Sequence, residues 1–115
     1  TKIVRGRIKN NAWTDEETVY EAPHETYLPT RQHYGCRIVF DKEGYLYFSI
    51  GERGVQDHAQ ELGRPNGKVH RIWPDGRIPE DNPFVKTPGA LPTIYSYGNR
   101  NPQGMAISPV DGHLW

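Results

Sequence analysis

A β-hairpin is predicted by the sequence Arg37-Ile38-Val39-Phe40-Asp41-Lys42-Glu43-Gly44-Tyr45-Leu46-Tyr47-Phe48-Ser49-Ile50. Two runs rich in β-branched and aromatic residues flank four polar or flexible ones, and such runs favour strands. Gly44 supplies the left-handed backbone that a tight turn requires. We therefore expect residues 37–40 to form one strand and residues 45–50 its antiparallel partner.

The hairpin pattern occurs again near the end of the chain. Residues 105–108 and 112–115 repeat the types of residue found at 38–41 and 44–47, with a turn glycine at Gly112 as at Gly44. A second similarity joins residues 2–8 to residues 68–72. Chance similarity between hairpins that share turn chemistry is one explanation. Repeated sheet units, as in a β-propeller, are the other, and they account for both similarities.

Composition supports an all-β chain. It contains 12 glycines and 10 prolines among 115 residues, and only 35% of its residues are hydrophobic, which is typical of many short strands joined by turns. Further strands are expected at residues 1–9, 17–22, 68–73, 93–97 and 104–108, with a turn over 10–16 and a short helical turn within 56–62.

These elements divide the chain into parts of a propeller. Residues 1–34 are expected to be the end of one blade and a connecting loop, residues 35–97 one complete blade, and residues 98–115 the start of the next. Since this pattern places neither end at a blade boundary, we expect residues 1–115 to be a partial β-propeller domain of a longer chain.

Charge and cysteine content exclude several classes of function. The formal net charge is zero, so binding to nucleic acid or to an anionic membrane surface is not favoured. No apolar run is long enough for a membrane span or a signal peptide. The single cysteine, Cys36, cannot form an internal disulfide and is expected to be a packed residue rather than a nucleophile. No metal-binding or phosphate-binding motif is found.

A polar cluster lies between Gly98 and Gly104. It contains Arg100, Asn101 and Gln103, whose planar donors and amide groups suit a flat, oxygen-rich anion. The glycines would allow the backbone to approach such a ligand closely. A solvated hairpin loop is the alternative.

His33 is a candidate general base because it precedes the first strong strand and has Gly35 close behind it. A loop histidine that only forms hydrogen bonds is the alternative. Glu52 and Arg53 follow the strand 45–50, where they could pair with each other or line a site. His70 alternates with apolar neighbours and is expected to be structural or solvent-facing.

Five motifs together resemble the soluble aldose sugar dehydrogenases that use pyrroloquinoline quinone, in the glucose/sorbosone dehydrogenase family. They occur in the family's order and spacing, and they cover nearly the whole chain: residues 33–40, 44–54, 66–72, 75–84 and 97–104. The resemblance implies a six-bladed β-propeller, in agreement with the repeat.

The resemblance also implies an activity. It is the oxidation of aldoses at the anomeric C1 hydroxyl to lactones, with hydride transfer to the quinone and passage of electrons to an external acceptor. His33 matches the family's general base, Arg100 and Asn101 match residues that contact the quinone, and Gln103 lies in the same motif. The family is periplasmic or secreted and uses Ca²⁺, whose ligands are expected outside these 115 residues, so the chain alone should be inactive.

Two other functions would suit the same architecture. A non-catalytic β-propeller of the same superfamily would act as a binding module, and an unrelated repeat propeller would act as a scaffold. Neither requires both a histidine base and the polar pair of Arg100 and Asn101.

Overall fold

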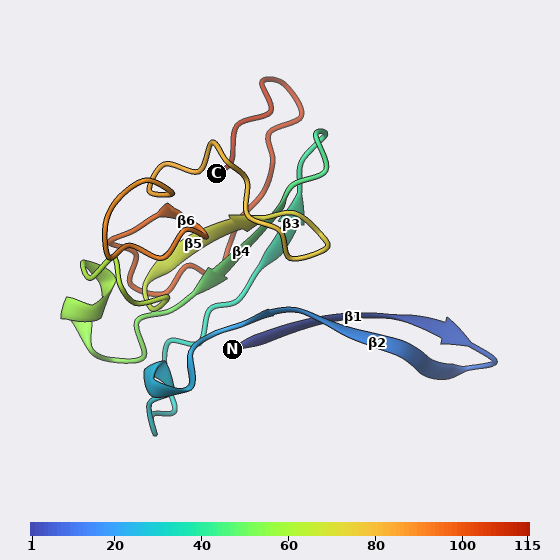
Figure 1. Cartoon of the computed structure of the whole chain (residues 1–115), viewed down its shortest axis with the longest axis horizontal. Helices are drawn as coiled ribbons and strands as arrows, with labels where there is room; N and C mark the ends of the chain where they lie inside the picture. The colour runs from blue at the N-terminus through green and yellow to red at the C-terminus, as the bar shows by residue number, and fades with distance from the viewer.

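The computed structural model describes all 115 residues and contains two antiparallel sheets (Figure 1). The first sheet pairs β1 (Lys2–Lys9) with β2 (Ala12–Glu21), and the second has the order β3 (Ile38–Phe40), β4 (Leu46–Ile50), β5 (Lys68–Ile72), β6 (Ile94–Ser96). Two short 3₁₀ helices, η1 (His24–Thr26) and η2 (Gln56–Ala59), lie in connections. Neither is long and apolar enough to cross a membrane. The predicted all-β fold is confirmed.

The repeated hairpin pattern is visible in the backbone. Phe40 pairs with Leu46, and the corresponding residues Ile107 and Leu114 form an antiparallel bridge. The strand predicted over 104–108 is nevertheless wrong, since this bridge is isolated. None of those five residues is buried, so the apolar packing that extends a strand is lacking there.

The β1–β2 hairpin is longer than predicted and projects from the body of the molecule (Figure 1). The turn expected over residues 10–16 is wrong, because only Asn10 and Asn11 form it, both at positive φ (50° and 59°). Asparagine tolerates this conformation better than most residues do. The ladder continues to the tip through the cross-strand pair of Ile8 and Trp13.

A small core joins the two sheets. All residues of β4 and β5 are buried, which follows from their central place in the four-stranded sheet. The Tyr20 ring, from the hairpin, lies 4.6 Å from the Phe48 ring of β4. The core cluster consists of Ile3, Val19, Leu46, Phe48, Ile50 and Ile72. The hairpin is therefore anchored at its base by the same residues that hold the larger sheet.

His70 is fully buried at the centre of β5, so of the two roles expected for it the structural one is confirmed and the solvent-facing one is wrong. Its Nε2 atom lies 3.0 Å from the Pro65 carbonyl oxygen, and its Nδ1 atom lies 2.9 Å from the Thr93 hydroxyl. Because a carbonyl can only accept, Nε2 carries the proton and Nδ1 accepts from Thr93. The ring also stacks on Phe48 at 4.8 Å. Burial lowers the pKa of His70 to about 4.

This lowered pKa predicts acid sensitivity. Below its ordinary pKa near 6.5, His70 binds a proton in the unfolded chain but not in the folded one, so stability is lost as the pH falls from about 6.5 to about 4. The loss from this group should approach about 3 kcal/mol. Urea unfolding at pH 7 and pH 4 measures it. His70→Phe should be less stable at pH 7 but should lose less on acidification, and an equal acid loss in both proteins would contradict the prediction.

Candidate functional site

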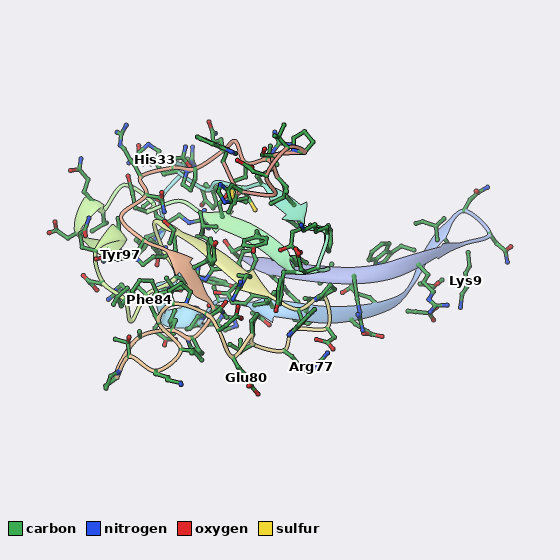
Figure 2. All side chains as sticks on the ribbon, turned by 90° about the horizontal axis from the view of Figure 1, so that it is seen from above. Lys9, His33, Arg77, Glu80, Phe84 and Tyr97 are labelled. Atoms are coloured by element: carbon green, nitrogen blue, oxygen red, sulfur yellow. The ribbon has the colours of Figure 1, made fainter.

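Three segments far apart in the sequence meet just beyond the end of β4. They are the loop before β3, which carries His33, the residues Gly51 and Glu52 after β4, and the loop after β6, which carries Arg100. The Glu52 N–H donates to the Arg100 carbonyl oxygen at 2.9 Å, which fixes the last two segments against each other. Figure 2 shows His33 and Tyr97 at one end of the molecule and the hairpin tip, marked by Lys9, at the other.

His33 and Glu52 form the central contact of this site. The Nδ1 atom of His33 lies 2.5 Å from the Oε1 atom of Glu52, and Glu52 is buried, with 1% of its side chain exposed. An ionised carboxylate can only accept, so Glu52 holds the proton of His33 on Nδ1. The other ring nitrogen, Nε2, is thereby left with a free lone pair. The His33 side chain is 18% exposed, so a ligand can reach it.

Arg100 completes the charge balance around Glu52. Its Nε atom lies 3.8 Å from the same Oε1 atom that contacts His33, while 71% of its side chain is exposed. The second oxygen, Oε2, accepts a hydrogen bond from the Gly54 N–H. Since the contact with Glu52 is long and the guanidinium has five N–H donors, most of them are available to an anionic ligand.

Asn101 fastens the His33 loop to the loop that follows β6. Its Oδ1 atom accepts a hydrogen bond from the Gly35 N–H at 3.0 Å, and its own amide N–H group donates to no protein atom. A Cβ atom at Gly51 would lie 2.7 Å from Oδ1 and would collide with the His33 carbonyl oxygen. Only glycine at position 51 therefore allows the three segments to approach so closely.

Ser49 supports the same arrangement from inside β4. Its hydroxyl is fully buried, donates to the Pro102 carbonyl oxygen at 2.6 Å and accepts from the Arg37 N–H at 3.1 Å. The loop of the polar cluster is thus tied to the sheet. Gln103, by contrast, is exposed and its side chain forms no hydrogen bond within the protein. The structure therefore brings His33, Arg100 and Asn101 together and leaves Gln103 outside their contacts.

A pocket of about 260 Å³ opens beside Arg100. Most of the residues that line it carry polar side chains; they are Glu52, Gln56, Ala59, Gln60, Gly98 and Arg100. The amides of Gln56 and Gln60, on and next to η2, extend the set of donors and acceptors that Arg100 begins. No group of three His, Cys, Asp or Glu residues is placed to hold a metal ion.

Glu52 is the site residue whose partner the sequence did not reveal. The alternative in which it pairs with Arg53 is wrong, because its carboxylate contacts His33 and Arg100 while Arg53 lies apart. The available signal was a carboxylate two residues after an apolar strand, because a side chain so close to a buried strand is itself placed in the interior. Cys36 was expected to be packed and is exposed instead, so that prediction is wrong.

Comparison with known proteins gives a consistent result. The family model described as Glucose / Sorbosone dehydrogenase matches residues 1–115. The aldose sugar dehydrogenase YliI of Escherichia coli (strain K12) is 46% identical over 117 residues, which cover 100% of this chain and 31% of that protein. A solved glucose dehydrogenase structure superposes with a TM-score of 0.92 at 33% identity, covering 99% of this chain and 33% of that one.

A further solved structure contains a cofactor. The PQQ-bound form of aldose sugar dehydrogenase from Streptomyces coelicolor superposes with a TM-score of 0.79 at 32% identity, over 98% of this chain and 32% of that one. The chain therefore spans about a third of the length of the relatives it matches.

Proposed function

Because this chain belongs to the Glucose / Sorbosone dehydrogenase family and forms part of a β-propeller, we propose that it carries half of the active site of a PQQ-dependent aldose dehydrogenase. The observation that carries the proposal is the contact of His33 with the buried Glu52 beside an exposed Arg100. A surface loop without a catalytic role has no need of a buried carboxylate aimed at a histidine ring.

The donors at this site suit pyrroloquinoline quinone. That molecule presents carboxylates and quinone oxygens, and Arg100 offers N–H donors to such groups in a planar fork. Asn101 has an amide N–H group without a protein partner. We propose that these two residues bind the quinone, with Gln103 at the edge of the site. A nearby cation also stabilises negative charge as it develops on reduction.

We propose that His33 removes the proton from the anomeric hydroxyl of the sugar. The proton passes to Nε2 as the hydride leaves C1, and the C1–O bond becomes the carbonyl of a lactone. The quinone, when bound, supplies the acceptor for that hydride. Glu52 keeps the Nδ1 proton in place and stabilises the imidazolium that forms, much as a buried carboxylate orients a catalytic histidine elsewhere.

Other features of the whole protein belong to the same proposal. We propose that Ca²⁺, which the family resemblance implies, would be held by other residues of the longer protein. This chain alone should then be inactive. We also propose that the whole protein passes its electrons to an external acceptor and is periplasmic or secreted. Residues 35–97 are proposed to form one blade of the propeller, because they contain all four strands of the larger sheet.

A binding module remains the alternative function, and turnover distinguishes it from an enzyme. The full protein that contains residues 1–115 should reduce a dye when given PQQ, Ca²⁺ and an aldose. Saturable sugar binding without dye reduction by the fully loaded protein would favour the binding module.

Arg100→Gln should weaken binding of PQQ. The substitution removes the positive charge from a group that we place against carboxylates, and hydrogen bonds to charged groups are worth about 1.5–3 kcal/mol, so the dissociation constant should rise at least about tenfold. Calorimetric titration with PQQ in the presence of Ca²⁺ measures it. Arg77→Gln is the matched control, because 73% of that side chain is exposed on another loop. Equal affinity of the two variants would remove Arg100 from the cofactor site.

A further inference from the structure

Lys68 is a buried cation at the end of β5 that lies nearest the candidate site. It is the first residue of β5 and pairs with Ile50, the last residue of β4, after which Gly51 and Glu52 enter the site. Lys68 is fully buried, whereas lysine is almost never fully buried unless its charge has a partner. The groups that surround its ammonium therefore show what the residue does.

Three backbone carbonyl oxygens accept hydrogen bonds from the Lys68 ammonium. They belong to Asn66 at 2.7 Å, His58 at 2.8 Å and Ala59 at 3.0 Å. An ammonium has three N–H donors, so this set uses all of them. Burial lowers the pKa of Lys68 to about 8, while the Glu61 carboxylate raises it, so the group is charged at pH 7. Because His58 and Ala59 are the last two residues of η2, the ammonium joins η2 to the start of β5.

The same junction holds the loop that leads to Arg100. The Ala59 oxygen accepts a second hydrogen bond, from the Gly98 N–H at 2.8 Å. The Gly67 oxygen, just before the buried lysine, accepts one from the Asn99 N–H at 3.0 Å. A Cβ atom at Gly67 would lie 2.5 Å from the Asn99 carbonyl oxygen and 2.6 Å from the Ala59 Cβ atom. The loop before Arg100 therefore packs directly against η2 and the start of β5.

We propose that Lys68 is a positioning residue, whose ammonium holds η2 and the loop before Arg100 together so that the pocket beside Arg100 keeps its shape for the quinone. Both sides of the junction supply residues that line this pocket: Gln56 and Gln60 from η2 and its end, and Gly98 and Arg100 from the loop. Lys68 does not line the pocket, so it acts only through the backbone. The inference rests on the quinone site proposed above.

A general contribution to stability is the alternative role for such a side chain, and Asn82 provides the comparison. Asn82 is 3% exposed and also forms three hydrogen bonds, with the Arg71 side chain and with the carbonyl oxygens of Arg71 and Pro92. None of these residues lines the pocket beside Arg100. Asn82→Leu is therefore the matched control, because it removes as many buried hydrogen bonds at a place away from the junction.

Hydrogen exchange of the full protein, followed by mass spectrometry, measures how firmly the loop is held. Lys68→Met has a side chain of similar length without N–H donors. In this variant residues 97–101 should exchange at least about tenfold faster than in the unmodified protein. Residues 46–50 report on the sheet as a whole and should change less. In Asn82→Leu both segments should change by the same factor.

Calorimetric titration with PQQ in the presence of Ca²⁺ tests the consequence for the site. The dissociation constant of Lys68→Met should rise about three- to tenfold, because the lost hydrogen bonds no longer hold the two walls of the pocket together. Asn82→Leu should bind PQQ like the unmodified protein. Lys68→Gln keeps two N–H donors on a shorter side chain and should bind with an intermediate affinity.

The proposal is overturned if Lys68→Met accelerates exchange equally over residues 97–101 and 46–50, or if it binds PQQ as tightly as Asn82→Leu does. Circular dichroism shows whether each variant is folded. If Lys68→Met does not fold, Lys68→Gln decides the matter by the same two comparisons. Failure of the unmodified protein to bind PQQ would contradict the proposed function instead, and the exchange ratio would still decide whether Lys68 holds the loop.

Discussion

Replacement of His33 with alanine should lower the turnover of aldose by the full protein about 10²- to 10⁴-fold, the range in which a general base contributes to catalysis. The sugar hydroxyl would lose its proton acceptor, while Arg100 and Asn101 would still be present to bind the quinone. Dye reduction with saturating PQQ, Ca²⁺ and aldose measures the change. His24→Ala is the matched control, because that histidine is 82% exposed and its only ion pair is with Glu21. If the two variants retain equal turnover, His33 is not the base.

A second variant tests whether Glu52 assists His33 in the reaction or only supports the fold. Glu52→Gln keeps an oxygen that can accept the Nδ1 proton of His33 but removes the negative charge that stabilises the imidazolium. Turnover should fall less than in His33→Ala, and the acidic limb of the pH–rate profile should move to lower pH. A uniform loss of turnover with an unchanged pH profile would indicate that Glu52 only supports the fold.

Replacement of Gly51 with alanine should damage the site without touching any reacting group. The added Cβ would lie 2.5 Å from the carbonyl carbon of His33 and 2.7 Å from Oδ1 of Asn101. The His33 loop would have to move away from Glu52, and a displacement of about 1 Å can cost about 10²-fold in rate. Overpacking of this kind also destabilises proteins by about 1–3 kcal/mol.

The control for this variant lies in the polar cluster. A Cβ atom at Gly104 would meet no atom within 4 Å, and its backbone is not in the left-handed region. Gly104→Ala should therefore leave the thermal unfolding midpoint unchanged, which makes it the control for stability. If Gly51→Ala is as active as the unmodified protein, the close approach at the end of β4 does not position His33.

The sequence predicts this fold best where the pattern is local. The hairpin of β3 and β4 is indicated by consecutive apolar residues on both sides of one turn glycine. In the repeat of this pattern, Ile107 pairs with Leu114, as Phe40 pairs with Leu46 in the first hairpin. The long β2 strand could not be predicted this way. Its exposed face is charged, and it is stabilised by pairing across the hairpin, including the ion pair of Arg5 and Glu17 at 2.5 Å.

In the candidate site, too, the sequence predicts local motifs but not contacts between distant residues. His33 and Arg100 were found because each lies in a recognisable motif, whereas the partner of Glu52 depends on a contact between residues 19 positions apart. Adjacent charges in a sequence suggest a pair, but the chain turns at Arg53 and Gly54, both at positive φ, and the side chains of Glu52 and Arg53 go to different surroundings. Only the folded backbone decides which of two neighbouring residues enters a site.

The tip of the β1–β2 hairpin is a suitable place to attach a tag or a label. Its tip at Asn10 and Asn11 is exposed and lies at the opposite end of the molecule from His33 (Figure 2). The two strands are joined by their own ladder and are anchored at the base through Ile3 and Val19. An affinity tag or a fluorescent label inserted at the tip would therefore report on the protein from a distance, and a protease that cut there would leave both strands attached.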